Sequence, residues 1–272
     1  MKLPLALLGA LIALAPPAAG AAAKARVTKA EASQARLAFE RGKLIYAYDR
    51  AAWQGSDDLV AKVPDYASKV GGWIVDGPAD SAQLVFYDKD EADPHAVYIA
   101  SFQGAKLSSS HVVGAGGDRT LSPARKAMIA ARRAALQALD GSDIDRCKEQ
   151  PFNSVVLPPE KPGAPTLVYV MTPQSSLKAI PIGGHYRIEV APDGKAGAPR
   201  PLAQSCLEMP LEDTAGHRPA ALFVTDTLNP VPTEMEVFSS FAAGLPIQVT
   251  TGNGRLWQVN GTGIKAMAAK RP

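Results

Sequence analysis

The chain has 272 residues, of which 46% are hydrophobic and 20% are charged. These proportions are those of an ordinary globular protein, and they exclude a disordered, collagen-like or coiled-coil chain. The 29 basic and 26 acidic side chains give a net charge of only +3, so the charge does not favour binding to nucleic acid.

The first residues have the pattern of an export signal. Lys2 precedes an apolar run over 3–15, and small residues follow as far as Ala23. The run is too short for a membrane-spanning helix, which needs about 20 apolar residues, so a retained anchor is the weaker alternative. We expect residues 1–23 to be a signal peptide, and the mature chain to be periplasmic or secreted with no membrane span.

A long helix is expected at the start of the mature chain. Thr28 and Glu31 have the spacing of a capping box, and an Ala-rich segment free of proline continues to about Gln54. A second, shorter helix is predicted from Ser56 to near Pro64, because Ser56 is followed by two aspartates.

The apolar side chains of the long helix cover an arc too wide for a single neighbour. The sheet can cover one side, and the short helix after Ser56 is a candidate to cover the other. The side of Leu37, Leu44 and Tyr48 is therefore covered either within the chain or by a protein partner or a second copy.

Further elements follow from periodicity and from turn residues. Extended segments are predicted over 73–75, 84–87, 97–102, 155–157, 167–171, 186–190, 202–207, 222–225, 247–250 and 256–259. Ser122 and Pro123 begin an Ala-rich helix that ends near Leu139, and Thr233 with Glu236 begins a short one.

The predicted fold class is therefore α+β. It is mainly antiparallel sheet, with a long N-terminal helix, an Ala-rich central helix and a short C-terminal helix. The mature chain divides into an N-terminal α+β half over 24–145 and a mainly β half over 146–272, or forms one continuous domain.

Cys147 and Cys206 are the two cysteines of the chain. In an oxidising compartment we expect them to form a disulfide, which stabilises the fold by roughly 4 kcal/mol for a loop of this length. A catalytic thiol or a pair of metal ligands is the alternative.

Short strings over 151–159, 183–186 and 205–207 resemble those of exported bacterial proteins that have no assigned activity. The resemblance spans roughly residues 70–264. It implies no catalytic residue, cofactor or partner that can be carried over to this chain.

His185, Arg187 and Glu189 alternate with apolar residues, so in a strand they share one face. The plain interpretation is that this face is exposed to solvent. In that case replacing His185 leaves the stability of the fold nearly unchanged. The alternative makes His185, oriented by Glu189 or another carboxylate, an acid, a base or a ligand, with Gly183 and Gly184 allowing a ligand or a neighbouring backbone to approach.

Arg125 and Arg132 lie seven residues apart, beside the apolar stripe of the central helix. They are interpreted either as side chains at the rim of the core or as a recognition site for an anionic group. Four histidines without ligand spacing, and two acidic loops without the order of a calcium loop, lead us to expect no metal and no cofactor.

The sequence favours a non-catalytic exported protein that binds a partner or ligand in the cell envelope. The alternative is an exported hydrolase whose site is assembled around His185. The position of His185 in the fold distinguishes the two hypotheses.

Overall fold

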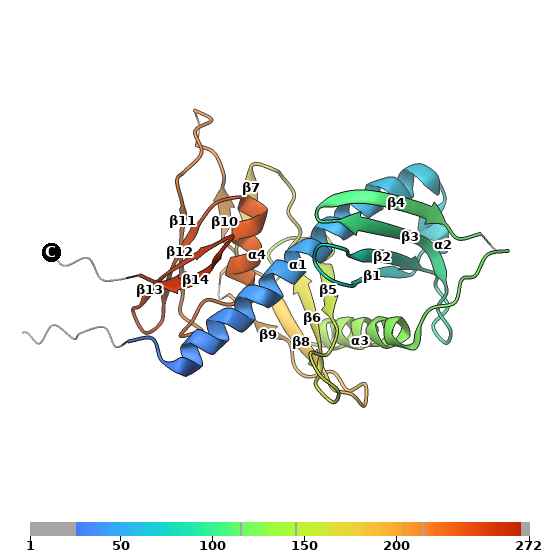
Figure 1. The fold of residues 1–272 in the computed structure, drawn as a ribbon, viewed down its shortest axis with the longest axis horizontal. Helices are drawn as coiled ribbons and strands as arrows, with labels where there is room; N and C mark the ends of the chain where they lie inside the picture. The colour runs from blue at the N-terminus through green and yellow to red at the C-terminus, as the bar shows by residue number, and fades with distance from the viewer. Residues whose placement is uncertain (1–25, 115, 145, 204, 214, 268–272) are drawn as a thin grey trace, which may run out of the picture.

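The computed structural model describes residues 26–114, 116–144, 146–203, 205–213 and 215–267 (Figure 1). The predicted signal peptide lies outside these residues. The fold consists of helices and several antiparallel sheets, which confirms the α+β class and the long N-terminal helix.

The helices are α1 (Lys29–Lys62), α2 (Tyr66–Lys69), α3 (Pro123–Asp140) and α4 (Glu234–Ala243). The first seven strands are β1 (Gly72–Asp76), β2 (Gln83–Tyr87), β3 (Ala96–Gln103), β4 (Lys106–Val112), β5 (Asn153–Leu157), β6 (Thr166–Met171) and β7 (Ala179–Pro181). The remaining strands are β8 (Tyr186–Val190), β9 (Arg200–Pro201), β10 (Glu208–Pro210), β11 (Leu222–Asp226), β12 (Ile247–Thr251), β13 (Leu256–Asn260) and β14 (Gly263–Ala266).

The strands form three four-stranded sheets and one small pair. The first sheet has the order β1-β2-β3-β4, the middle sheet β5-β6-β8-β9 and the last sheet β11-β12-β13-β14, while β7 pairs with β10. All described pairings are antiparallel except that of β11 with β12. Helix α4 lies between these two strands in the chain and forms the crossover that joins them. Parallel strands need such a crossover, because a tight hairpin turn joins only antiparallel strands.

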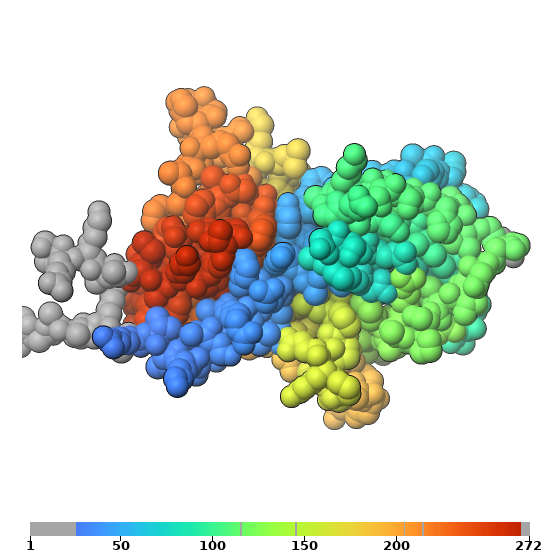
Figure 2. Space-filling model, in the orientation of Figure 1, coloured from blue at the N-terminus to red at the C-terminus, as the bar shows by residue number. Residues whose placement is uncertain are grey.

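Helix α1 runs through the centre of the molecule and contacts elements of all three sheets (Figure 1). Its 34 residues span about 51 Å at 1.5 Å per residue. In Figure 2 it lies between the last sheet, in red, and the first sheet, in green and teal. One helix therefore connects regions of the chain that are far apart in sequence.

The predicted end of the first helix near Gln54 is wrong. Helix α1 continues through Ser56, whose hydroxyl donates to the carbonyl of Ala52 rather than capping a new helix. The added turns are attached to the first sheet by Asp58, whose carboxylate accepts hydrogen bonds from Tyr98 at 2.5 Å and Ser110 at 2.6 Å. These tertiary contacts favour a continued helix where the local sequence favours a new start.

Two glycines of α1 mark its closest approaches to other elements. A Cβ atom on Gly42 would overlap Val237 and the backbone of Glu234 in α4. A Cβ atom on Gly55 would overlap Leu84 of β2. The helical cost of these glycines, about 1 kcal/mol each, is offset by close packing that no other residue permits.

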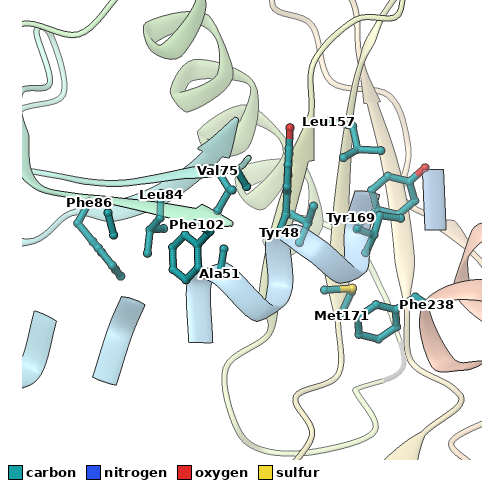
Figure 3. Packing of buried hydrophobic residues seen from close by; sticks show 14 of the residues in the cluster. Tyr48, Ala51, Val75, Leu84, Phe86, Phe102, Leu157, Tyr169, Met171 and Phe238 are labelled. Carbon is teal, nitrogen blue, oxygen red and sulfur yellow. The ribbon is translucent and has the colours of Figure 1, made fainter. Parts of the chain in front are cut away.

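The wide apolar arc of α1 is covered largely within the chain. Tyr48 is 2% exposed and Leu44 packs against the same core cluster. Figure 3 shows Tyr48 between residues of the first sheet and of the middle sheet. The short helix after Ser56, the candidate to cover this side, is part of α1 itself, and α4 and the sheets pack against α1 instead. Leu37 keeps 38% of its surface exposed, and self-association through this helix stays a prediction.

The observed strands differ from the predicted ones at several points, and the short strands β7 and β14 were not expected. Strand β4 was not expected, because its sequence Lys106–Val112 is polar and mostly exposed. Of the strand predicted over 202–207, the described residues 202, 203 and 205–207 form no strand, and only the short segments on either side, β9 and β10, pair with other strands. The predicted bridge between Cys147 and Cys206 is confirmed, with an S–S distance of 2.02 Å.

The division of the chain at residue 145 is not matched by a division of the core. One buried cluster joins Phe86 of the first sheet with Tyr169 of the middle sheet, and a second joins Ile129 of α3 with Ile188. A third cluster gathers around Trp257 in the last sheet.

Candidate functional site: a cleft between two tryptophans

A cleft of about 260 Å³ opens where α1, α4 and the first two sheets meet. The side chains that give the cleft its character are Asp49, Arg50, Trp53, Trp73, Asn153, Gln174 and Phe238. We call it the tryptophan cleft, because it contains two of the three tryptophans of the chain.

Helix α1 supplies one wall of the tryptophan cleft. Asp49, Trp53 and Ser56 follow one another at intervals of four and three residues, so they share one face of the helix. The other wall contains Trp73 from β1 and Asn153 from the start of β5. The cleft is thus assembled from segments that are about a hundred residues apart.

Asp49 and Arg50 are the two charged residues that line the cleft. The Asp49 carboxylate is buried and accepts two hydrogen bonds from the Arg50 guanidinium, at 2.6 and 3.2 Å. Burial raises the pKa of Asp49, whereas the neighbouring Arg50 charge acts in the opposite direction. Since the two charges oppose each other, the lining has no net charge.

Each tryptophan of the cleft is held by an arginine. The Arg50 guanidinium lies 4.2 Å from the centre of the Trp53 ring, and the Arg132 guanidinium lies 4.8 Å from the centre of the Trp73 ring. These distances are typical of cation–π interactions. Trp53 nevertheless keeps 41% of its surface exposed, so its ring remains accessible.

The predicted binding candidates Arg125 and Arg132 both have partners within the chain. Arg125 forms an ion pair with Asp76 at 2.8 Å and also donates to Gln83. Arg132 donates to Ser154 at 2.8 Å and to Tyr87 at 3.2 Å. Because Trp73 and Ser154 line the cleft, Arg132 supports its wall from behind.

The predicted solvated position of His185 is wrong, because this side chain is only 1% exposed. Its Nδ1 accepts a hydrogen bond from the Thr172 backbone N–H at 3.2 Å, and its Nε2 lies 3.2 Å from the Pro181 carbonyl oxygen. Burial lowers the pKa of His185 to about 4, so the ring is neutral near pH 7 and donates from Nε2 to Pro181.

The side chains of His185 and Glu189 are not brought together. Glu189 is exposed and pairs with Arg187 at 3.1 Å, whereas both ring nitrogens of His185 are occupied by backbone groups. Strand β8 begins at Tyr186, one residue after His185, and Gly184 before it has a left-handed conformation. The alternation of the strand therefore does not extend to His185. Thr172 and Pro181 line the tryptophan cleft, so His185 positions a wall of that cleft.

Gly183 and Gly184 are explained by the disulfide region rather than by a ligand. A Cβ atom on Gly184 would overlap the sulfur of Cys147, and one on Gly183 would overlap the carbonyl oxygen of Ser205. The neighbouring backbone therefore approaches at these positions, as one of the two sequence interpretations expected.

Among the described residues, no group of three or more His, Cys, Asp or Glu side chains is arranged to hold a metal ion. None of the described helices is long and apolar enough to cross a membrane.

The chain matches no protein-family model, no curated protein and no solved structure.

Sequence reasoning missed the tryptophan cleft, although Trp53 and Trp73 were visible in the predicted elements. The signal that could have found it is Asp49, a carboxylate whose neighbours at helical spacing, Ile45, Tyr46, Ala52 and Trp53, are all apolar. The other lining residues could not be assigned to the cleft from the sequence, because residues such as Trp53 and Asn153 are far apart in the chain.

Proposed function

We propose that the mature chain is an exported, non-catalytic binding protein, and that the tryptophan cleft binds a small uncharged molecule. This molecule combines an apolar ring face with hydroxyl or amide groups. The single observation that carries the proposal is the cleft itself, in which two tryptophans and a partly buried ion pair meet in one concave site.

The lining supports an uncharged ligand. A charged ligand would have to compete with the Asp49–Arg50 pair, whose atoms are 2.6 Å apart. An apolar ring gains from burial against Trp53 and Phe238, and polar groups of the ligand can bond to Asn153.

The polar side chains of the cleft favour binding over catalysis, because several already maintain its walls. The Thr172 hydroxyl lies 3.0 Å from the carbonyl oxygens of Gly183 and Gly184, and Ser56 donates to Ala52. The Gln174 amide donates to Ser176 and Ala179.

Export is supported by two features. The disulfide between Cys147 and Cys206 is typical of proteins from oxidising compartments. The first 23 residues have the pattern of a cleavable signal. Intact mass of the protein purified from its cells should show an N-terminus near residue 21–24 and no free thiol.

Fluorescence provides the test of ligand binding, because two of the three tryptophans line the cleft. The neutral dye N-phenyl-naphthylamine should bind saturably and quench tryptophan emission by energy transfer. Ala242→Phe, which fills the cleft without removing a tryptophan, should weaken dye binding at least about tenfold.

The control variant is Phe223→Ala, which removes an aromatic ring that is 69% exposed on β11, outside the cleft. It should leave dye binding unchanged. Equal dye binding in wild type and Ala242→Phe would contradict the proposal. Neutral sugars and neutral aromatic amides then compete with the dye, which identifies the polar part of the ligand.

A further inference from the structure

A second cleft, of about 230 Å³, lies farther towards the N-terminus of α1. It is bordered by Arg41 of α1, Arg187 of β8, Arg200 of β9 and the segment 229–234 that leads into α4. We call it the arginine cleft. It shares no lining residue with the tryptophan cleft, so it is a separate site.

The lining of the arginine cleft is positively charged. It contains three arginines and one carboxylate, Glu234. That carboxylate is buried and already accepts from the Tyr169 hydroxyl at 2.7 Å and from Arg187 at 2.8 Å. It is therefore committed to the interior of the protein.

Two further carboxylates lie at the rim. Glu160 pairs with Arg41 at 2.8 Å, and Glu189 pairs with Arg187 at 3.1 Å. Both glutamates are 52% exposed, and an ion pair exposed to water contributes little. An anion that enters the cleft can displace them from the arginines at small cost.

Arg187 has an unused donor. Its side chain is only 11% exposed, and its buried Nε has no hydrogen-bond partner among the residues that the structure describes. Buried guanidinium N–H groups without an acceptor are rare, because each loses its bonds to water. Because Arg187 lines the cleft, an acceptor that inserts beside its guanidinium would satisfy this group.

Arg200 is held in position by a neutral partner. Its Nη2 donates to Asn229 Oδ1 at 2.7 Å, and the Asn229 amide donates to Asp226 at 3.0 Å. The Arg200 guanidinium is thus oriented by an amide, and its charge is available at the rim of the cleft.

From the arginines around one cavity and the unpaired Nε, we propose that the arginine cleft binds a small oxyanion, the phosphate or carboxylate group of a small molecule. A guanidinium group presents its N–H donors in a plane that matches two oxygens of such a group. The volume of the cleft, about 230 Å³, admits one small molecule. The proposal does not depend on the function proposed for the tryptophan cleft.

Isothermal titration calorimetry of the mature, disulfide-bonded protein tests this site. One titration uses inorganic phosphate and another uses acetate, each to about 10 mM against sodium chloride of equal ionic strength. Saturable binding in either titration supports the proposal, and the tighter one distinguishes phosphate from carboxylate. No saturable binding in both would overturn it.

Variants locate the binding. Arg200→Gln and Arg41→Gln should each weaken binding about tenfold, since each removes a charged donor. Arg187→Lys keeps the charge beside Glu234 but removes the Nε–H, and it should weaken binding as well. Arg36→Gln, an exposed position of α1 outside this cleft, is the matched control and should bind like wild type. Unchanged binding in both Arg200→Gln and Arg41→Gln would show that the anion lies elsewhere.

Discussion

The tryptophan cleft and the arginine cleft are built by the same two helices. Residues 49–56 of α1 and the C-terminal half of α4 line the first, whereas residues 34–41 of α1 and the N-terminus of α4 line the second. The strands make the difference: β1 and β5 add Trp73 and Asn153, whereas β8 and β9 add Arg187 and Arg200. A shared framework thus produces one neutral cleft and one cationic cleft.

A buried titratable group supports each cleft, and the two shift in opposite directions. His185, behind the tryptophan cleft, has a pKa lowered to about 4 by burial. Glu236, in the capping box that begins α4 at the arginine cleft, has a pKa raised to about 7, first by burial and then by the nearby Asp226 charge. The two regions are therefore expected to respond oppositely to pH.

The largest expected effect comes from Gly55→Val, which pushes α1 away from the first sheet. A side chain here would overlap Leu84, so we expect the free energy of unfolding to fall by about 3 kcal/mol, with loss of dye binding at the tryptophan cleft. Urea denaturation measures the change. Gly141→Ala, at which an added Cβ would meet only ordinary contacts of 3.6 Å and more, is the control and should change stability little.

The same experiment at Gly42 addresses the other cleft. Gly42→Val would overlap Glu234 and Val237 of α4, so it should impair oxyanion binding together with stability. Wild-type stability in both valine variants would show that α1 does not approach its neighbours this closely.

A smaller loss is expected from His185→Ala, which removes both backbone contacts of a buried ring. We expect the free energy of unfolding to fall by about 2–3 kcal/mol and dye binding to weaken, because Thr172 and Pro181 lose their shared anchor. His217→Ala, with a side chain 80% exposed, should behave like wild type. A variant as stable as wild type would restore the original expectation of a solvated His185.

The smallest expected effect is the change in wild-type stability with pH, because two pH dependences oppose each other. Between about pH 4 and 6.5 the unfolded chain protonates His185 and the folded one does not, so this group stabilises the fold as pH rises. Between about pH 4.5 and 7 the folded chain keeps Glu236 protonated while the unfolded one does not, so this group destabilises the fold as pH rises.

Single variants separate the two contributions. Glu236→Gln should leave a stability that rises from about pH 4.5 to 6.5, and His185→Gln one that falls over the same range. Urea denaturation at several pH values measures both slopes. Equal slopes in the two variants would contradict the assignment of one shift to each group.

Features encoded within a few residues were determined by the sequence alone. The Thr28–Glu31 and Thr233–Glu236 capping boxes both form, and Ser122 caps α3 as its spacing predicts. Runs of β-branched and aromatic residues between turn residues predicted the strands of the first sheet other than β4. The hairpin of the last sheet was predicted from two such runs on either side of a glycine-rich turn. The sequence holds two cysteines, and their pairing in one disulfide was predicted from it.

The burial of His185, the continuation of α1 past Ser56 and both clefts were decided by the tertiary structure. Ser56 has the local features of a helix start, yet Gly55 against Leu84 and Asp58 against Tyr98 favour an unbroken helix. His185 follows a polar pattern, yet its ring bonds to Thr172 and Pro181. Each outcome depends on contact partners that are distant in the sequence, so the sequence does not show that they are close in space. The free energy of packing comes from contacts that form only when the whole fold is assembled.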